Sequence, residues 1–446
     1  MKNKEIIQLS DHFGYKRLIK FVIPSIIMMI FTSVYGVVDG LFVSNFVGKT
    51  AFAAVNLIMP LLIMLGAVGF MLGTGGCAIV AKTFGLGDSK RANEYFSTII
   101  YVTIVAGSLL AILGMIFVRP IAALLGASGE MLEDCVIYSR FVLIGLPFFM
   151  LQNTFQSFFI TAERPKLGLL VIVGAGVTNM LLDALLVAVI PLGLVGAALA
   201  TATSQIVGGV IPLVYFSSKN SSTLHLGKTR LYPKMLLAAS VNGSSELMSN
   251  IAMSVVNMLY NLQLMHYAGE DGVAAYGTIM YVGFIFIAIF IGFVMGSAPI
   301  VSYHFGAGNT DELQSLRKKS VNIIAITSLA MLISALLLAR PLSLVFVGYD
   351  KALCDMTTRG FIIFSFGYLF AGFNIFGSSF FTALNNGAVS AVISFLRTLV
   401  FQVLTVLILP LIFALDGVWY ATVAAELLSL AVTLSFLIAM RKKYRY

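Results

Sequence analysis

The sequence predicts an all-α polytopic membrane protein with twelve transmembrane helices, and three observations support this. Of 446 residues, 59% are hydrophobic and only 11% are charged, with a mean hydropathy of +0.98; an ordinary soluble domain carries about 25% charged residues. Apolar stretches long enough to cross the roughly 30 Å hydrocarbon core of a bilayer recur along the whole chain. The chain also repeats itself once, without gaps, at an offset of 221 residues.

Each long apolar stretch is predicted to be a helix, because backbone N–H and C=O groups in lipid must be hydrogen-bonded within their own segment. Arg119-Pro120 and Arg340-Pro341 follow the third and ninth stretches, and a basic cluster follows the twelfth, as expected at membrane interfaces. The predicted spans are, in order, 17–43, 51–80, 95–118, 136–162, 167–190, 193–216, 236–266, 273–303, 319–339, 356–383, 388–413 and 417–440.

The repeat divides these spans into two sets of six. Phe84-Gly85 recurs as Phe305-Gly306, and Asn153 recurs as Asn374. Because six is an even number, the halves cross the membrane in the same direction and form a parallel repeat. We predict an amino-terminal six-helix bundle with an ion site at 1–216, a cytoplasmic linker at 217–235, and a carboxy-terminal six-helix bundle at 236–446.

The net charge of +9 arises from basic residues in short loops. With twelve spans most of them fall on one side, so the positive-inside rule predicts a multi-pass protein of the plasma membrane with both termini in the cytoplasm. This distribution argues against a nucleic-acid partner. The cysteines Cys77, Cys135 and Cys354 form no CxxC pair and do not suggest a disulfide framework.

The sequence lacks a phosphate-binding loop, a nucleophile elbow and an HExxH motif. We therefore expect neither an enzyme nor an ATP-driven pump, and no cofactor apart from a coupling ion. No obligate protein partner is inferred.

Acidic residues inside the predicted spans are the candidate functional residues, because a charge at the centre of a bilayer costs at least about 2.5 kcal/mol. They are Asp39, Asp183, Glu246 and Glu426. At the offset of the repeat they correspond to Tyr260, Leu404, Ser25 and Gln205, so none is duplicated. Scaffold residues repeat whereas the acids do not, which indicates that the halves have different tasks.

Asp39 and Asp183 are expected at similar depth in the first bundle, because the first and fifth spans both run outward. Tyr35 and Asn179 each precede one of these acids by four residues and share its helix face. Further polar side chains of this bundle are Gln152, Asn153, Gln156, Thr201 and Gln205. Such oxygen-rich groups suit a hard monovalent cation or a proton, and loss of water makes a carboxylate easier to protonate. The structural alternative is that Asp39 caps a helix end and that Asn179 satisfies Asp183.

In the second half, Glu246 ends the polar run Asn242-Gly-Ser-Ser-Glu246 and is a candidate for a cavity wall. Arg397 and Glu426 fall at mid-depth and are expected to form a buried structural pair. The many Phe and Met residues are expected mainly in packing, although part of them would suit an adaptable drug cavity.

With these residues the chain resembles the multidrug and toxic compound extrusion (MATE) family. The resemblance rests on the parallel repeat, on Tyr35-Gly-Val-Val-Asp39, on Asn179-xxx-Asp183 and on the Phe84-Gly85-Leu-Gly87-Asp88 loop. It implies a V-shaped pair of bundles that exports cationic amphipathic drugs by antiport with H⁺ or Na⁺.

The resemblance also assigns site residues. The coupling site would comprise Asp39, Asn153, Asn179, Asp183 and Thr201, with a possible Na⁺ at Asp39, Asn179 and Asp183. Glu246 is similar to an acid that some members use in the second bundle, but Asn374 stands where a further acid would be expected. Candidates for a substrate or second-bundle site are Tyr35, Gln156, Gln205, Glu246 and Asn374.

The alternative function is a flippase for lipid-linked oligosaccharides or lipids, from the related superfamily. Such proteins need a basic cavity for a pyrophosphate, whereas Arg397 is the one basic residue at mid-span here. The acidic spans therefore favour cationic small molecules as substrates.

Overall fold

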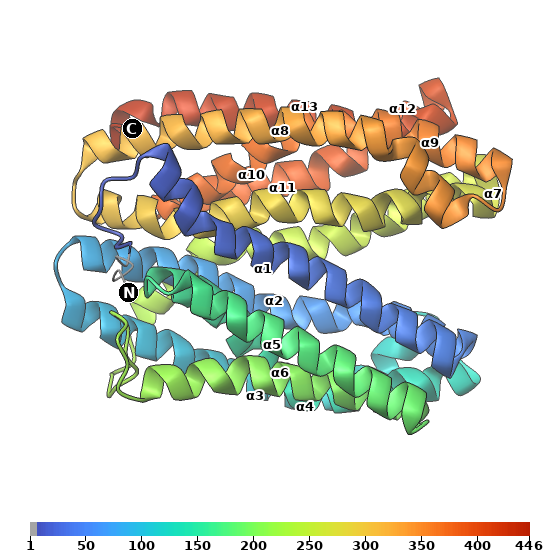
Figure 1. The fold of residues 1–446 in the computed structure, drawn as a ribbon, viewed down its shortest axis with the longest axis horizontal. Coiled ribbons are helices and arrows are strands. Elements are labelled where there is room, and N and C mark those ends of the chain that lie inside the picture. Colours follow the sequence, from blue (N-terminus) through green and yellow to red (C-terminus); the bar gives the residue numbers. More distant parts are fainter. Residues whose placement is uncertain (1–6) are drawn as a thin grey trace, which may run out of the picture.

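The computed structural model describes residues 7–446, which are helical apart from short connections and form two lobes (Figure 1). The amino-terminal lobe is built from α1 (Tyr15–Phe42), η1 (Val43–Val47), α2 (Lys49–Gly85), α3 (Ser89–Leu124), α4 (Gly129–Thr161), α5 (Pro165–Asp183), η2 (Ala184–Val189) and α6 (Gly193–Ser217), where η denotes a π-helical segment. The carboxy-terminal lobe is built from α7 (Pro233–Gly306), α8 (Thr310–Val347), α9 (Lys351–Ser365), α10 (Tyr368–Ala383), α11 (Gly387–Phe395), η3 (Leu396–Phe401), α12 (Gln402–Phe413), α13 (Leu415–Ala439) and α14 (Arg441–Tyr444).

These elements make twelve spans, although not all are separate helices. Ten continuous helical stretches are long and apolar enough to cross a membrane, and α9 with α10 forms an eleventh span bent by 46°. The 74-residue α7 supplies two spans, because its backbone is not helical at Gly269 (φ 62°, ψ −150°). The predicted architecture of two six-helix bundles is confirmed.

Helix ends differ from the predicted spans where a helix continues beyond the apolar stretch. The span predicted at 95–118 is observed as Ser89–Leu124, because the helix extends back to its cap at Asp88, whose side chain accepts a hydrogen bond from Arg91 N–H. Asn309, the repeat partner of Asp88, caps α8 in the same way through Glu312 N–H. The two halves therefore share their turn chemistry as well as their spans.

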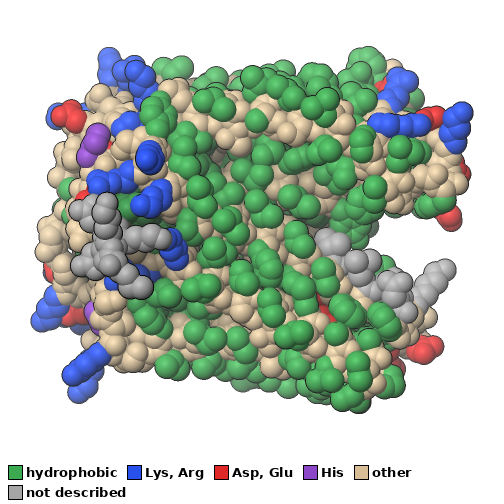
Figure 2. Space-filling model, in the orientation of Figure 1, with side chains coloured by type: hydrophobic (Ala, Val, Ile, Leu, Met, Phe, Trp, Pro, Cys, Tyr) green, Lys and Arg blue, Asp and Glu red, His purple; other side chains and the backbone are tan. Residues whose placement is uncertain are grey.

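The molecule has a closed end and an open end. The described amino-terminal segment and the C-terminus lie at the closed end (Figure 1), and the space-filling view is notched between the lobes at the opposite, open end (Figure 2). Toward the closed end α2 packs on α7 with almost no space between the backbones. A Cβ on Gly75 would lie 2.0 Å from Ala239 O, and one on Gly243 would lie 1.9 Å from Met71 O. Glycine permits this close approach of two membrane helices.

The π-helical segments lie beside the residues singled out from the sequence. Segment η1 begins four residues after Asp39, η2 directly follows Asp183, and η3 contains Arg397. Short π-helical insertions are frequent at functional sites, since they rotate the side chains that follow. Their positions therefore indicate one candidate site in each lobe.

Candidate functional site: one cavity in each lobe

The amino-terminal lobe encloses a cavity of about 250 Å³ between α1, α2, α4, α5 and α6. Its walls bring together the residues that were predicted from four separate spans. They include Tyr35, Asp39, Gln152, Asn153, Gln156, Asn179, Thr201 and Gln205. Apolar side chains such as Phe70, Leu146 and Phe149 line the rest of the cavity. A cluster of polar groups therefore lies inside a largely apolar bundle.

Asp183 lies just behind this wall, fully buried, at the last residue of α5. Asp39 and Asp183 are close enough for each to affect the ionisation of the other, and Asn179 also reaches Asp39. The ion pairs among the described side chains include neither Asp39 nor Asp183. The two acids therefore lie together and are not neutralised by a described arginine or lysine.

Many buried polar atoms around this pair have no hydrogen-bond partner among the described residues. They are Asp39 Oδ1, both carboxylate oxygens of Asp183, Asn179 Oδ1, Asn153 Nδ2, Gln156 Oε1, Thr201 Oγ1 and Gln205 Oε1. Buried polar groups are normally paired, and each unpaired one costs about 1–3 kcal/mol. Oxygen atoms predominate, so a proton, a hard cation or water is the kind of partner that would satisfy the cluster.

Among the described residues, no three His, Cys, Asp or Glu side chains lie close enough together to hold a metal ion. The donors around Asp39 are instead two carboxylates with neutral amide and hydroxyl oxygens. Such a donor set fits a singly charged hard cation or a proton and lacks the soft ligands that transition metals prefer.

Tyr138 also belongs to this cluster, although it was not predicted from the sequence. Its side chain is fully buried in α4, close to both acids. Its hydroxyl, like that of Thr201, has no hydrogen-bond partner among the described residues. The missed signal is the spacing of Tyr138, Gly145 and Gln152 at intervals of seven, which places them on one helix face. Gly145 leaves space for the Gln205 side chain, because a Cβ there would lie 2.3 Å from Gln205 Oε1.

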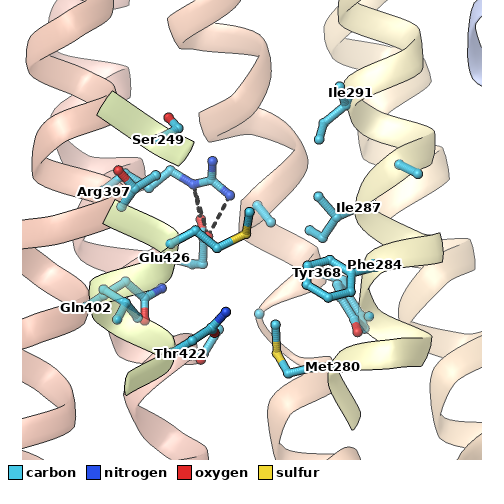
Figure 3. A pocket seen from close by; sticks show the side chains of 18 of the residues that line it. Ser249, Met280, Phe284, Ile287, Ile291, Tyr368, Arg397, Gln402, Thr422 and Glu426 are labelled. Carbon is cyan, nitrogen blue, oxygen red and sulfur yellow. Dashed lines mark hydrogen bonds and ion pairs between the residues drawn. The ribbon is translucent and has the colours of Figure 1, made fainter. Parts of the chain in front are cut away.

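The carboxy-terminal lobe holds a larger cavity, of about 340 Å³, shown in Figure 3. Arg397 and Glu426 form an ion pair on its wall, with Arg397 Nη2 2.8 Å from Glu426 Oε1. Asn374 donates to Glu426 Oε2 (2.7 Å) and accepts from Thr433. Asn374 is fully buried and lines neither this cavity nor the amino-terminal one, so the structure places it in the support of the ion pair.

Glu246 lies apart from that network. It lines the carboxy-terminal cavity and also a smaller one of about 160 Å³ between the lobes. Met29 of α1 lines both of these and the amino-terminal cavity as well. The cavities of the two lobes therefore meet at one side chain of α1.

Two pseudo-symmetric helical lobes, with unpaired acids deep inside the membrane-spanning region, define a membrane transporter of the two-bundle class. The chain belongs to the MATE family of multidrug efflux transporters, whose MatE profile matches residues 24–185 and 247–408, once in each half. Multiple apolar spans together with bacterial relatives indicate a multi-pass protein of the plasma membrane.

Curated relatives include the multidrug export protein MepA of two staphylococci. The protein of Staphylococcus haemolyticus is 26% identical over 74% of this chain and 73% of its own length. That of Staphylococcus saprophyticus is 24% identical over 99% of this chain and 96% of its own length.

Solved structures show the same fold. An outward-facing multidrug resistance MATE transporter matches with a TM-score of 0.93 at 21% identity, over the full length of both chains. A second, from Pyrococcus furiosus, described as having a binding pocket of reverse polarity that suggests a different function, matches with a TM-score of 0.91 at 21% identity over both full chains.

Proposed function

We propose that this protein exports cationic amphipathic compounds from the cell by antiport with H⁺ or Na⁺. The observation that carries the proposal is the unneutralised pair Asp39 and Asp183 among buried oxygens without partners. A proton or Na⁺ that enters from the open end would satisfy this cluster. Antiport follows if occupancy by the ion and occupancy by the substrate oppose each other, which is reciprocal linkage between two sites.

The residues have separate tasks in this proposal. Asp39 and Asp183 exchange the ion, whereas Asn179, Asn153 and Thr201 supply neutral oxygen or amide contacts around it. Because Asp39 lies on α1, whose Met29 borders all three cavities, a change of charge at Asp39 can be transmitted along one helix to the space between the lobes. No cofactor other than the coupling ion is needed.

The basic loops support an orientation with the closed end and both termini in the cytoplasm. In that orientation the notch of the open end faces outward. A protease site added at the C-terminus should then resist protease added to intact cells, and cleavage there would reverse the orientation.

The flippase alternative is less well supported, because Arg397 is already engaged by Glu426 through hydrogen bonds from Nε and Nη2. A pyrophosphate would have to displace that carboxylate. An ionised Glu246 on the same cavity would also repel it.

The proposal is tested in proteoliposomes by following transport of ethidium while a Na⁺ gradient or a pH gradient is imposed alone. We expect Asp39→Asn and Asp183→Asn each to reduce gradient-driven transport by about 5- to 150-fold, the usual range of a coupling free energy. The matched control is Asp271→Asn, the same change at an exposed acid of α7. Full gradient-driven transport by both variants would refute the coupling site.

A further inference from the structure

The linker between the lobes, residues 217–235, is fixed along the side of α3 at the closed end. Hydrogen bonds to one face of that helix hold its backbone, and they run from His225 N–H to Asn93 Oδ1 (2.7 Å), from Gly227 N–H to Ser97 Oγ (3.1 Å) and from Tyr101 OH to Gly227 O (3.1 Å). Leu224 is fully buried in the core of the amino-terminal lobe. The linker is therefore an ordered part of the surface of this lobe, and its outward side chains project from a backbone that is held in place.

The second part of the linker presents basic side chains that have no acidic partner. Lys228, Arg230 and Lys234 are exposed, and the linker itself contains no Asp or Glu. None of the three takes part in an ion pair among the described side chains. The nearby Glu94 accepts a hydrogen bond from the hydroxyl of Tyr232 instead. Basic side chains as a class gather at the closed end (Figure 2), and these three form an unneutralised group within seven residues of the chain.

Tyr101 indicates the depth of this basic group in the membrane. Its ring is exposed on the side of α3, while its hydroxyl donates to Gly227 O, directly before Lys228. A tyrosine with an exposed ring and a hydrogen-bonded hydroxyl is typical of the boundary between the hydrocarbon and the headgroups. The basic side chains that follow Gly227 therefore lie at the level of the lipid headgroups.

Exposed leucines accompany the basic residues. Leu231, next to Arg230, is 66% exposed, and Leu237 is 68% exposed. Leu237 follows Lys234 by three residues and lies on the same face of α7. Charged and apolar side chains thus alternate on one outward surface, as in segments that lie in the interface of a membrane.

We propose that Lys228, Arg230 and Lys234 bind the headgroup of an anionic phospholipid, with Leu231 and Leu237 against its acyl chains. Ammonium and guanidinium groups both donate hydrogen bonds to phosphate oxygens, and basic residues at a membrane surface attract anionic lipids. The exposed leucines favour a lipid over a soluble phosphate compound, which has no acyl chain to contact them. The site lies outside all three cavities described above, so it does not depend on the antiport proposal.

The site is tested by native mass spectrometry of the purified full-length protein in detergent, titrated with phosphatidylglycerol or with phosphatidylcholine of the same acyl chains. We expect the first phosphatidylglycerol to bind more tightly than phosphatidylcholine. The triple variant Lys228→Gln, Arg230→Gln and Lys234→Gln should weaken its binding by about tenfold or more, since each basic residue adds to the attraction. The affinity for phosphatidylcholine should not change.

A matched control removes the same charges from exposed positions of the other lobe, in the triple variant Lys318→Gln, Arg441→Gln and Lys442→Gln. It should bind phosphatidylglycerol as the parent protein does. Equal affinities of the linker variant and the parent protein would overturn the proposal. An equal loss in both triple variants would also overturn it, because binding would then follow net charge and not the linker.

A second experiment separates a lipid from a soluble phosphate compound. Leu231→Ser combined with Leu237→Ser keeps the three charges and removes the apolar contacts, so it should weaken binding of phosphatidylglycerol. Leu337→Ser combined with Leu344→Ser, at exposed positions of α8, is the control and should leave binding unchanged. Glycerol phosphate added in excess should not displace the lipid. Displacement by glycerol phosphate, together with full binding by the Leu231 and Leu237 variant, would identify a soluble ligand and overturn the lipid assignment.

Discussion

At the scale of single residues, the charged groups of the spans fall into two kinds. Asp39, Asp183 and Glu246 lack a basic partner among the described side chains, whereas Glu426 is held by Arg397 and Asn374. A paired, hydrogen-bonded charge supports structure, because each partner offsets the cost of removing the other from water. An acid without a basic partner lowers stability, so its presence inside a span indicates a functional task. The proposed function rests on these unpaired acids.

The Arg397–Glu426 pair should therefore be a structural requirement. We expect Glu426→Gln to destabilise the protein by about 3–5 kcal/mol, because it leaves the charge of Arg397 uncompensated. The measurement is the thermal unfolding midpoint in detergent, with Glu130→Gln at an exposed site as control. The double variant Arg397→Met with Glu426→Leu should recover most of the loss. A double variant as unstable as the single one would show that the packing of these side chains, and not their charge, is what matters.

At the scale of helices, the contact between α2 and α7 closes one end of the molecule. It is pseudo-symmetric: a Cβ on Gly85 would lie 2.0 Å from Tyr303 O, and one on its repeat partner Gly306 would lie 2.1 Å from Lys82 O. Both approaches are to backbone atoms, which cannot rotate away. The closed arrangement therefore depends on glycine at both positions.

Gly85→Val should separate α2 from α7 at the closed end, because the added side chain overlaps the α7 backbone. We expect a longer distance between spin labels at Lys90 and Lys318, two exposed positions near the starts of α3 and α8, measured by double electron–electron resonance. Gly174→Val is the matched control, since a Cβ at Gly174 would have no neighbour within 4 Å. An unchanged distance in Gly85→Val would mean that this contact does not hold the lobes together.

At the scale of the whole molecule, the segment before α1 connects the lobes at the closed end. Leu9 N–H donates to Glu163 Oε1 (2.7 Å) in the α4–α5 connection, and Phe13 N–H donates to Glu312 Oε1 (2.9 Å) at the start of α8. Leu9 and Phe13 are buried in the core of the carboxy-terminal lobe. Opening this end requires at least the Leu9–Glu163 contact to break, because Glu163 belongs to the other lobe.

Glu163 should make stability dependent on pH. Burial raises the pKa of its carboxyl group above the ordinary 4.5, and the nearby Asp11 raises it further, against the opposing effects of Leu9 N–H and Arg164. Between pH 4.5 and the raised pKa, Glu163 keeps its proton in the folded protein but has released it in the unfolded chain. Stability from this group is therefore present below pH 4.5 and is lost as the pH rises through the raised pKa.

The comparison is between thermal unfolding curves of the parent protein and Glu163→Gln across that pH range. The parent protein should lose stability relative to the variant as the pH rises, because the amide of glutamine does not titrate. Parallel pH profiles for the two proteins would contradict the assignment of this effect to Glu163.

Some of the site could be predicted from sequence because four-residue spacing on a helix is a local property. Tyr35 with Asp39 and Asn179 with Asp183 each lie on one face. Helices α1 and α5 bring Tyr35, Asp39 and Asn179 to one cavity, and Asp183 lies just behind its wall. Tyr138 was missed, because its signal is the seven-residue spacing to Gly145 and Gln152 along the same helix, and only Gln152 of these is a polar amide that stands out in an apolar span. The spans predicted at 236–266 and 273–303 correspond to the two parts of α7 on either side of Gly269, where the backbone is not helical.

The sequence by itself determined the membrane class, the twelve spans and the two matched halves, because hydropathy, segment length and repetition can be read along a single chain. The pairing of Arg397 with Glu426 was also predicted from the sequence, and the structure confirms it. Only the tertiary structure decided that Asp39, Asp183 and Glu246 have no salt bridge among the described side chains. Arg397 reaches Glu426 and leaves Glu246 without a salt bridge, although all three lie on one cavity. That choice depends on how each helix is rotated against its neighbours, and packing between helices fixes that rotation.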